Sequence, residues 1–201
     1  MRVVLVHGFN VRDPAKTVGK LAAMFIAQGV RADHVKLFRY GWLGLLGVKF
    51  GNDNLAETLR CLLLEVADRG EPVIVIGHSN GCALIHRTAW LMDDRSDGHG
   101  IIERAVYLSP ALRRDAPPSP AVKQTDVFFT RNDWAVRASR LWPSEWGDMG
   151  ARGPVDDYNG RYRKVDGTVV IQGHSDYFSD NSRNFMLERH VRPLVAQYGR
   201  T

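Results

Sequence analysis

The sequence has few cysteines and no long hydrophobic run. Its 201 residues include two cysteines, Cys61 and Cys82, and both fall inside apolar patterns that predict helices. Two such cysteines are more typical of reduced core residues than of a disulfide or half of a metal site. No apolar run approaches the length of a bilayer-spanning helix, and strand-like sequence begins at Arg2 without a basic and apolar leader. We therefore expect no stable membrane insertion and a reducing, cytoplasmic location.

The sequence also lacks runs of basic residues and groups of metal-ligating residues. Lysine and arginine outnumber aspartate and glutamate by 27 to 22, for a formal net charge of +5, but no basic run is interleaved with aromatic residues. Nucleic-acid binding is therefore not indicated. No group of His, Cys and carboxylate residues has metal-ligand spacing, and the glycines after the first strand do not form a dinucleotide-binding fingerprint. We expect no nucleic-acid partner, no metal and no cofactor.

The length and the pattern of the chain favour one α/β domain. With 201 residues, of which 44% are hydrophobic, it can bury one sizeable core, so we expect a single domain over residues 1–201. Strand-like runs alternate with helical patterns, and the expected strands are 2–6, 35–40, 73–76, 105–108, 126–130 and 167–172. This alternation predicts a mostly parallel six-stranded sheet with helices on both faces.

Helix boundaries follow from caps and stops. Asp13 and Pro14 can begin a first helix that ends before Gly29, and residues 52–54 can cap a second helix. A third helix follows the strand 73–76, and the last helical pattern contains Pro193, where we expect a kink or a new turn.

One stretch carries a catalytic signature. The β-branched run 73–76 is followed by Gly77-His78-Ser79-Asn80-Gly81 and then by helix-forming sequence. In a strand, sharp turn and helix of this kind, the serine is held in a strained conformation with its hydroxyl exposed, and glycines are needed where side chains would clash. Ser79 is therefore the predicted nucleophile, although an ordinary strand-to-helix turn is the alternative.

Together with His7-Gly8-Phe9 after the first strand, this motif resembles the α/β-hydrolase superfamily, in particular its small esterase-like and lipase-like members. The resemblance covers essentially the whole chain but begins at the strand that carries His7-Gly8, so we expect the fold to lack the two strands that usually precede it. It implies a minimal α/β-hydrolase fold. The connection 112–125 is too short for a large cap insertion.

A serine hydroxyl needs a base, and the base needs an orienting acid. We predict His174 as the base because it lies just past the last expected strand and follows the order Ser, acid, His of this superfamily. The alternative is a capping or surface histidine. The predicted acid is Asp133, one short loop past the strand 126–130, whereas Asp126 would open that strand at the opposite edge.

The assignment of Asp133 as the orienting acid has alternatives. Asp133 can instead only cap a helix that begins near Trp134. Asp176 and Asp148 are the reserve acids. The histidines in the two glycine motifs, His7 and His78, are expected to be structural.

The oxyanion hole requires two backbone amides, one of them from the residue after the nucleophile, Asn80. By resemblance, Phe9 supplies the second amide, and its side chain can line the substrate pocket; the alternative is a tight β-α turn without a role in catalysis. The apolar stretch 42–50, which begins with Trp42, is either a flap over the site or core. The long segment 141–166 and Trp134 are further candidates for substrate contact.

These features predict a serine hydrolase that cleaves a carboxylic ester, a small-molecule or lipid-like substrate, through an acyl-enzyme intermediate. A thioesterase or acyltransferase with the same triad and a noncatalytic binding module with this fold are the alternatives, which fold alone does not exclude.

Overall fold

Six strands form one fully parallel sheet. The computed structural model describes residues 1–9, 11–40, 45–94, 100–139 and 146–199. The sheet has the order β2-β1-β3-β4-β5-β6, and its members are β1 (Arg2–Val6), β2 (Val35–Phe38), β3 (Val73–His78), β4 (Ile102–Leu108), β5 (Val122–Phe129) and β6 (Tyr162–Asp166). All the pairings are parallel, so the carboxyl ends of the strands meet at one edge of the sheet. The predicted six-stranded α/β architecture is confirmed.

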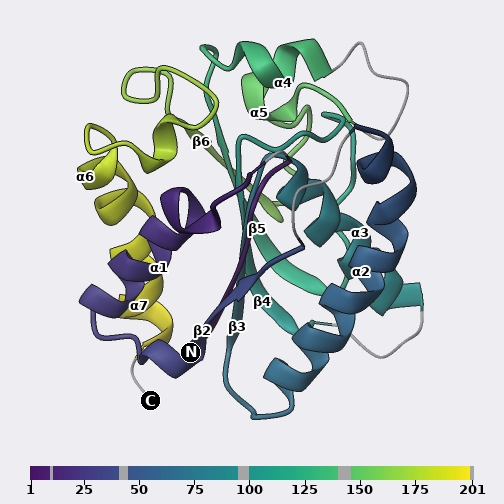
Figure 1. Cartoon of the computed structure of the whole chain (residues 1–201), viewed down its shortest axis with the longest axis vertical. Coiled ribbons are helices and arrows are strands. Elements are labelled where there is room, and N and C mark those ends of the chain that lie inside the picture. Colours follow the sequence, from purple (N-terminus) through teal and green to yellow (C-terminus); the bar gives the residue numbers. More distant parts are fainter. Residues whose placement is uncertain (10, 41–44, 95–99, 140–145, 200–201) are drawn as a thin grey trace.

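Helices cover both faces of the sheet (Figure 1). Helices α2 and α3 lie on one face, α1, α6 and α7 lie on the other, and the short α4 and α5 lie at the edge where the strands end. Their bounds are α1 (Val18–Ala27), α2 (Leu45–Ala67), α3 (Asn80–Asp94), α4 (Trp134–Ser139), α5 (Met149–Arg152), α6 (Arg183–Met186) and α7 (Arg192–Tyr198). Three 3-10 turns, Pro14–Lys16, Ala32–His34 and Asp176–Phe178, and a π-helical segment, Leu187–Val191, complete the described elements.

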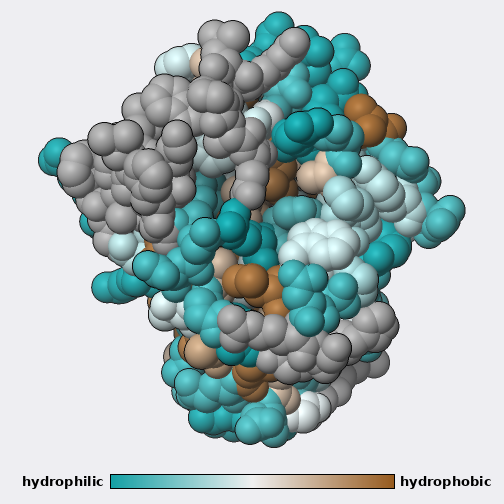
Figure 2. All heavy atoms as spheres, turned by 90° about the vertical axis from the view of Figure 1, so that its right-hand side faces the viewer, coloured by the Kyte–Doolittle hydropathy of each residue, from teal (hydrophilic) through white to brown (hydrophobic). Residues whose placement is uncertain are grey.

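Two apolar layers hold the helices against the sheet. Successive strand residues point to opposite faces, so Val4 and Val75 pack under α2 and α3, whereas Val3 and Ile74 pack under α1 and α7. All four are fully buried. Each fully buried aliphatic side chain contributes about 1.5–3 kcal/mol, so burial on both faces explains why these strands read as continuous apolar runs. On the α2 and α3 side, the coloured part of the surface is mostly hydrophilic, with a few hydrophobic patches (Figure 2).

The prediction for the last strand was wrong. The sixth strand is Tyr162–Asp166, and residues 167–172 form turns instead. The Asp166 side chain accepts a hydrogen bond from the Thr168 N–H (2.9 Å), and the Ile171 N–H donates to the Gly167 carbonyl (2.7 Å). These local bonds outweigh the β-propensity of the Thr-Val-Val-Ile run. The true strand lies at the sheet's edge and carries charged residues, as edge strands often do, which hides it in the sequence.

Other boundaries also differ from expectation. Strand β2 ends at Phe38 rather than at residue 40. Helix α2 begins at Leu45, so residues 52–54 lie inside it and do not cap it. Leu45–Phe50 therefore forms the first turns of α2, and the alternatives of flap or core for residues 42–50 stay open; Trp42 lies outside the described residues. Cys61 is exposed on α2, so only Cys82 is a core cysteine.

Asp126 does not open a strand, because β5 begins four residues earlier, at Val122. Its carboxylate is fully buried in the sheet and forms ion pairs with Arg104 (3.0 Å) and Arg163 (2.7 Å). The expected interruption near Pro193 is present: the π-helical segment ends at Val191, and Pro193 occupies the first turn of α7, where its missing N–H costs least. Among the described residues, no helix is both long enough and apolar enough to cross a bilayer.

Candidate active site

Ser79 occupies a sharp turn between β3, which ends at His78, and α3, which begins at Asn80. Its backbone φ is +54°, in the left-handed region that residues with a side chain rarely adopt. Backbone bonds hold it there: the Ser79 N–H donates to the Leu108 carbonyl (3.0 Å), and the Ala111 N–H donates to the Ser79 carbonyl (3.3 Å). The loop after β4 therefore fixes a strained serine at the carboxyl edge of the sheet.

The glycines beside Ser79 are required by close backbone approach. A Cβ at Gly81 would lie 2.5 Å from the carbonyl oxygens of Val6 and His7, and one at Gly77 would lie 2.8 Å from the Cys82 nitrogen. Neither backbone can move without displacing the sheet or the helix. The turn can therefore form only with glycine at these two positions.

His174 and Asp133 lie together, 41 residues apart in sequence. His174 Nδ1 and Asp133 Oδ2 are 2.8 Å apart, and the Asp133 side chain is fully buried, whereas that of His174 is 23% exposed. A carboxylate only accepts, so Nδ1 carries the proton and Nε2 keeps its lone pair. This is the tautomer that a general base requires.

Asp133 also caps a helix. Its second oxygen, Oδ1, accepts a hydrogen bond from the Val136 N–H (3.0 Å) in the first turn of α4. Oδ1 therefore caps α4 while Oδ2 contacts His174, and the role of Asp133 as the orienting acid stays a prediction. Burial opposes ionisation of Asp133, but the hydrogen bonds from His174 and from the Val136 N–H outweigh it and lower the pKa of the carboxyl.

His78 contacts the loop that carries His174. Its ring lies 4.7 Å from the His174 ring, and its Nε2 donates to the backbone carbonyl of His174 at 2.9 Å. Burial lowers the pKa of His78 to about 3, so the ring is neutral. Its Nδ1 is buried and has no hydrogen-bond partner among the described residues. The residue before the serine thus ties the nucleophile's turn to the histidine's loop.

Ser109 and Tyr177 lie behind the acid, and sequence reasoning missed both. Ser109 follows β4, is fully buried and has a φ of +46°. Its hydroxyl is 3.4 Å from that of Tyr177, and it helps to lower the pKa of the Asp133 carboxyl. No motif marks either residue, because their contacts depend on where β4 and β5 end in space.

The segment His7–Phe9 lies against the serine turn, since a Cβ at Gly8 would be 3.0 Å from the Ser79 Cβ. The Tyr40 hydroxyl donates to the His7 carbonyl (2.8 Å), and the two rings stack with centroids 4.0 Å apart. His7 Nδ1 in turn bonds the Gly8 carbonyl (2.8 Å). His7 thus has a structural role in shaping this loop.

Asn80 begins α3, where a backbone N–H has no partner within the helix. Its side-chain oxygen accepts from the Trp146 indole N–H (3.1 Å) and from the Asn52 amide (3.3 Å). The Trp146 ring also lies 6.0 Å from that of Phe9. Trp146 thus bridges the two residues predicted to form the oxyanion hole.

The other predicted substrate contacts are spread around this edge. Phe9 is half-buried, and Trp134, the first residue of α4, is 74% exposed. Residues 140–145 of the segment 141–166 lie outside the described residues, and its described part contains α5 and β6. Among the described residues, neither reserve acid forms a hydrogen bond or ion pair with His174: Asp148 pairs with Arg152 (3.2 Å), and Asp176 accepts from the Gln172 N–H (3.0 Å). The described residues contain no group of three or more His, Cys or carboxylate side chains suited to a metal ion.

Comparison with solved structures returns hydrolases of the same fold. Esterase Pf2001 from Pyrococcus furiosus is 12% identical, with a TM-score of 0.63 over 98% of this chain and 83% of that one. The metagenome-derived lipolytic enzymes LipS and LipT give 14% identity and a TM-score of 0.58 over 94% and 91%. An extracellular α/β-hydrolase from a Paenibacillus species gives 11% identity and a TM-score of 0.55 over the full length of both chains.

The chain also matches phospholipase PlaB from Legionella pneumophila at 20% identity and a TM-score of 0.46, but it spans only 25% of that protein. No curated protein sequence matches it significantly. The sequence model described as "Alpha/beta hydrolase family" matches residues 3–198. Almost the whole chain is covered by this match, and the parallel sheet agrees with it, so the protein belongs to the α/β hydrolase family.

Proposed function

We propose that the protein is a serine hydrolase that cleaves carboxylic esters through an acyl-enzyme intermediate. The observation that carries the proposal is the 2.8 Å contact between His174 Nδ1 and the buried Asp133, at the sheet edge where Ser79 has a φ of +54°. A serine held in a strained turn and an oriented histidine at the same edge of the sheet are features that nucleophilic catalysis uses.

In the first half-reaction, the Ser79 Oγ attacks the acyl carbon while His174 Nε2 takes its proton. The carbonyl oxygen becomes an oxyanion, which the N–H groups of Phe9 and Asn80 stabilise. Asp133 stays ionised and stabilises the imidazolium. When the intermediate collapses, the C–O bond to the alcohol breaks, and His174 returns the proton to the leaving oxygen.

In the second half-reaction, water replaces the alcohol. His174 Nε2 removes a proton from water, the hydroxide oxygen attacks the acyl carbon, and the Ser79 oxygen leaves with that proton. The products are a carboxylic acid and the free enzyme. No metal or cofactor takes part in this sequence of steps.

The proposed substrate is a small-molecule or lipid-like ester. Similar structures are named as an esterase and as lipolytic enzymes, which supports an ester more than an amide. The free thiols of Cys61 and Cys82 are compatible with work in a reducing cytoplasm.

The same residues would serve a thioesterase or an acyltransferase, and the reactions differ in the leaving group and in what attacks the acyl-enzyme. The test is turnover of p-nitrophenyl esters and of matched thioesters by wild type and Ser79→Ala, with and without added alcohols. We expect ester hydrolysis that disappears in the variant, while the variant's circular dichroism matches wild type. A folded Ser79→Ala protein that still turns over the ester at the wild-type rate would refute the proposal.

A further inference from the structure

A hollow beside α3 is separate from the Ser79 site. It has a volume of about 570 Å³, within the range of about 300–1,000 Å³ that is typical of small-molecule sites. It is lined by side chains of α3, among them His86 and Trp90, and by side chains of the connection after β4, among them Leu112, Ala116 and Pro117. None of the residues proposed for ester cleavage is among them. His86 lies about 9 Å along the helix from Asn80, at a rise of about 1.5 Å per residue.

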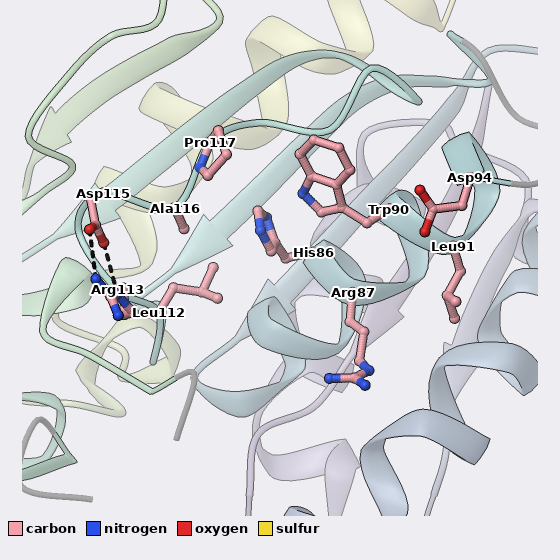
Figure 3. Close-up of a pocket in the computed structure, with 10 residues that line it drawn as sticks. All are labelled: His86, Arg87, Trp90, Leu91, Asp94, Leu112, Arg113, Asp115, Ala116 and Pro117. Carbon is pink, nitrogen blue, oxygen red and sulfur yellow. Dashed lines mark hydrogen bonds and ion pairs between the residues drawn. The ribbon is translucent and has the colours of Figure 1, made fainter. Parts of the chain in front are cut away.

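The hollow exists because a crossover helix is absent. Parallel strands are usually joined by a helix that covers the sheet, but residues 109–121, between β4 and β5, form only turns and extended chain. This connection runs beside α3 and supplies Leu112, Ala116 and Pro117 to one wall. The opposite wall comes from His86 and Trp90 of α3, and the five side chains surround one space (Figure 3).

The arginines at the hollow have acidic partners. Arg113 donates to Asp115 from both Nε (3.0 Å) and Nη2 (2.8 Å), and Arg87 forms an ion pair with Asp53. In Figure 3 the Arg87 side chain also extends away from Trp90. Beside His86, a charged ligand would therefore find these counter-charges already engaged, and desolvating it there would be unfavourable. Asp94, the remaining charged lining residue, lies a further turn beyond Trp90 along α3, away from His86. This favours an uncharged ligand between His86 and Trp90.

His86 supplies a polar group in the middle of the hollow. Burial lowers the pKa of its imidazole to about 4, so at neutral pH the ring offers one N–H donor and one acceptor nitrogen. The His86 ring lies edge-on to the Trp90 ring, with centroids 6.5 Å apart. An aromatic ligand would pack against the indole, and a hydroxyl on it would bond the imidazole.

We propose that this hollow is a second binding site, which takes an uncharged aromatic molecule that bears a hydroxyl group. The site rests on Trp90 and the apolar wall for affinity and on His86 for recognition of the hydroxyl. It does not depend on ester hydrolysis, so it stands or falls separately from the proposed function.

The test uses 2-naphthol and naphthalene as matched probes, titrated into the full chain carrying Ser79→Ala and followed by 1H–15N NMR. We expect saturable binding of both, with shifts confined to residues 86–91 and 112–117. His86→Phe should weaken 2-naphthol about two- to tenfold and leave naphthalene unchanged, because one hydrogen bond is lost. Trp90→Leu should weaken both probes.

A matched control is His34→Phe, which removes a histidine outside the hollow and should change neither affinity. The proposal is overturned if 2-naphthol does not saturate, if the shifts centre on Ser79 and His174, or if His86→Phe weakens both probes equally. The NMR mapping needs no substitution in the hollow, so it decides the question even if Trp90→Leu does not fold.

Discussion

Replacing Asp133 by asparagine separates its two roles. In Asp133→Asn the side-chain oxygen can still accept from the Val136 N–H, now 3.0 Å from Oδ1, so the cap of α4 remains. That N–H also fixes the amide's orientation, because the NH2 group cannot face another donor. The NH2 group must then face His174 Nδ1, 2.8 Å from Oδ2 in the native protein. Two donors cannot share that contact, so Nδ1 must give up its proton and accept.

In Asp133→Asn, the His174 imidazole therefore adopts the wrong tautomer. With the proton moved to Nε2, His174 cannot accept a proton from Ser79, and we expect kcat to fall by about 10³–10⁴. At about 1.36 kcal/mol per factor of ten, this loss is about 4–5.5 kcal/mol of transition-state stabilisation. Stability to urea should change little, whereas Asp133→Ala should lose a further ~1 kcal/mol of unfolding free energy because the cap is also removed.

The assay is kcat and KM for p-nitrophenyl butyrate, measured beside urea unfolding for wild type, Asp133→Asn and Asp133→Ala. A kcat for Asp133→Asn within tenfold of wild type would mean that Asp133 does not orient the base. Equal stability of the two variants would mean that Oδ1 does not cap α4.

Three further predictions follow from buried groups. His78→Leu should lower kcat about tenfold or more with little change in KM, since the His174 carbonyl loses its hydrogen-bond donor at a cost of about 1–3 kcal/mol. His78→Gln, which keeps a donor, should restore part of the lost kcat. Equal rates in wild type and both variants would exclude this positioning role. Burial lowers the pKa of His190 to about 3, so between pH ~6.5 and pH 3 the unfolded chain binds a proton that the native protein does not, and stability decreases as the pH is lowered. In urea unfolding, His190→Phe should reduce this pH dependence by up to about 1.4 kcal/mol per pH unit. An unchanged pH dependence would argue against a neutral His190. Gly81→Ala should lower the melting temperature and abolish turnover, because its Cβ would lie 2.5 Å from the Val6 carbonyl, and a stable, active variant would show that the turn can relax.

The sequence was informative where one local pattern decides one local structure. The β-branched runs predicted strands at 2–6 and 73–76, which the structure has at 2–6 and 73–78, and the glycines at 77 and 81 predicted a turn whose close contacts the structure contains. Asp133 and His174 were predicted from the expected strand ends and from the order of the triad in the superfamily that the chain resembles; the two side chains meet, although the strand expected just before His174 is not there. None of these inferences needed knowledge of distant packing.

Sequence reasoning failed where tertiary contacts decide. The edge strand β6 was hidden by its charged residues, and the apolar run at 168–171 folds into turns because of hydrogen bonds around Gly167. His78 reaches a carbonyl 96 residues away, and Ser109 meets Tyr177 across 68 residues. Such contacts leave no periodic or spacing signal.

The central claim is that Ser79 becomes acylated during turnover. The direct measurement is mass spectrometry of the protein mixed with p-nitrophenyl acetate and quenched in acid within the first turnovers, followed by peptide mapping. We predict one acetyl group per chain, on the peptide that contains Ser79, and none in Ser79→Ala. Ester hydrolysis by wild type without any acetylated Ser79 peptide, or an adduct that persists at another residue in Ser79→Ala, would contradict the account.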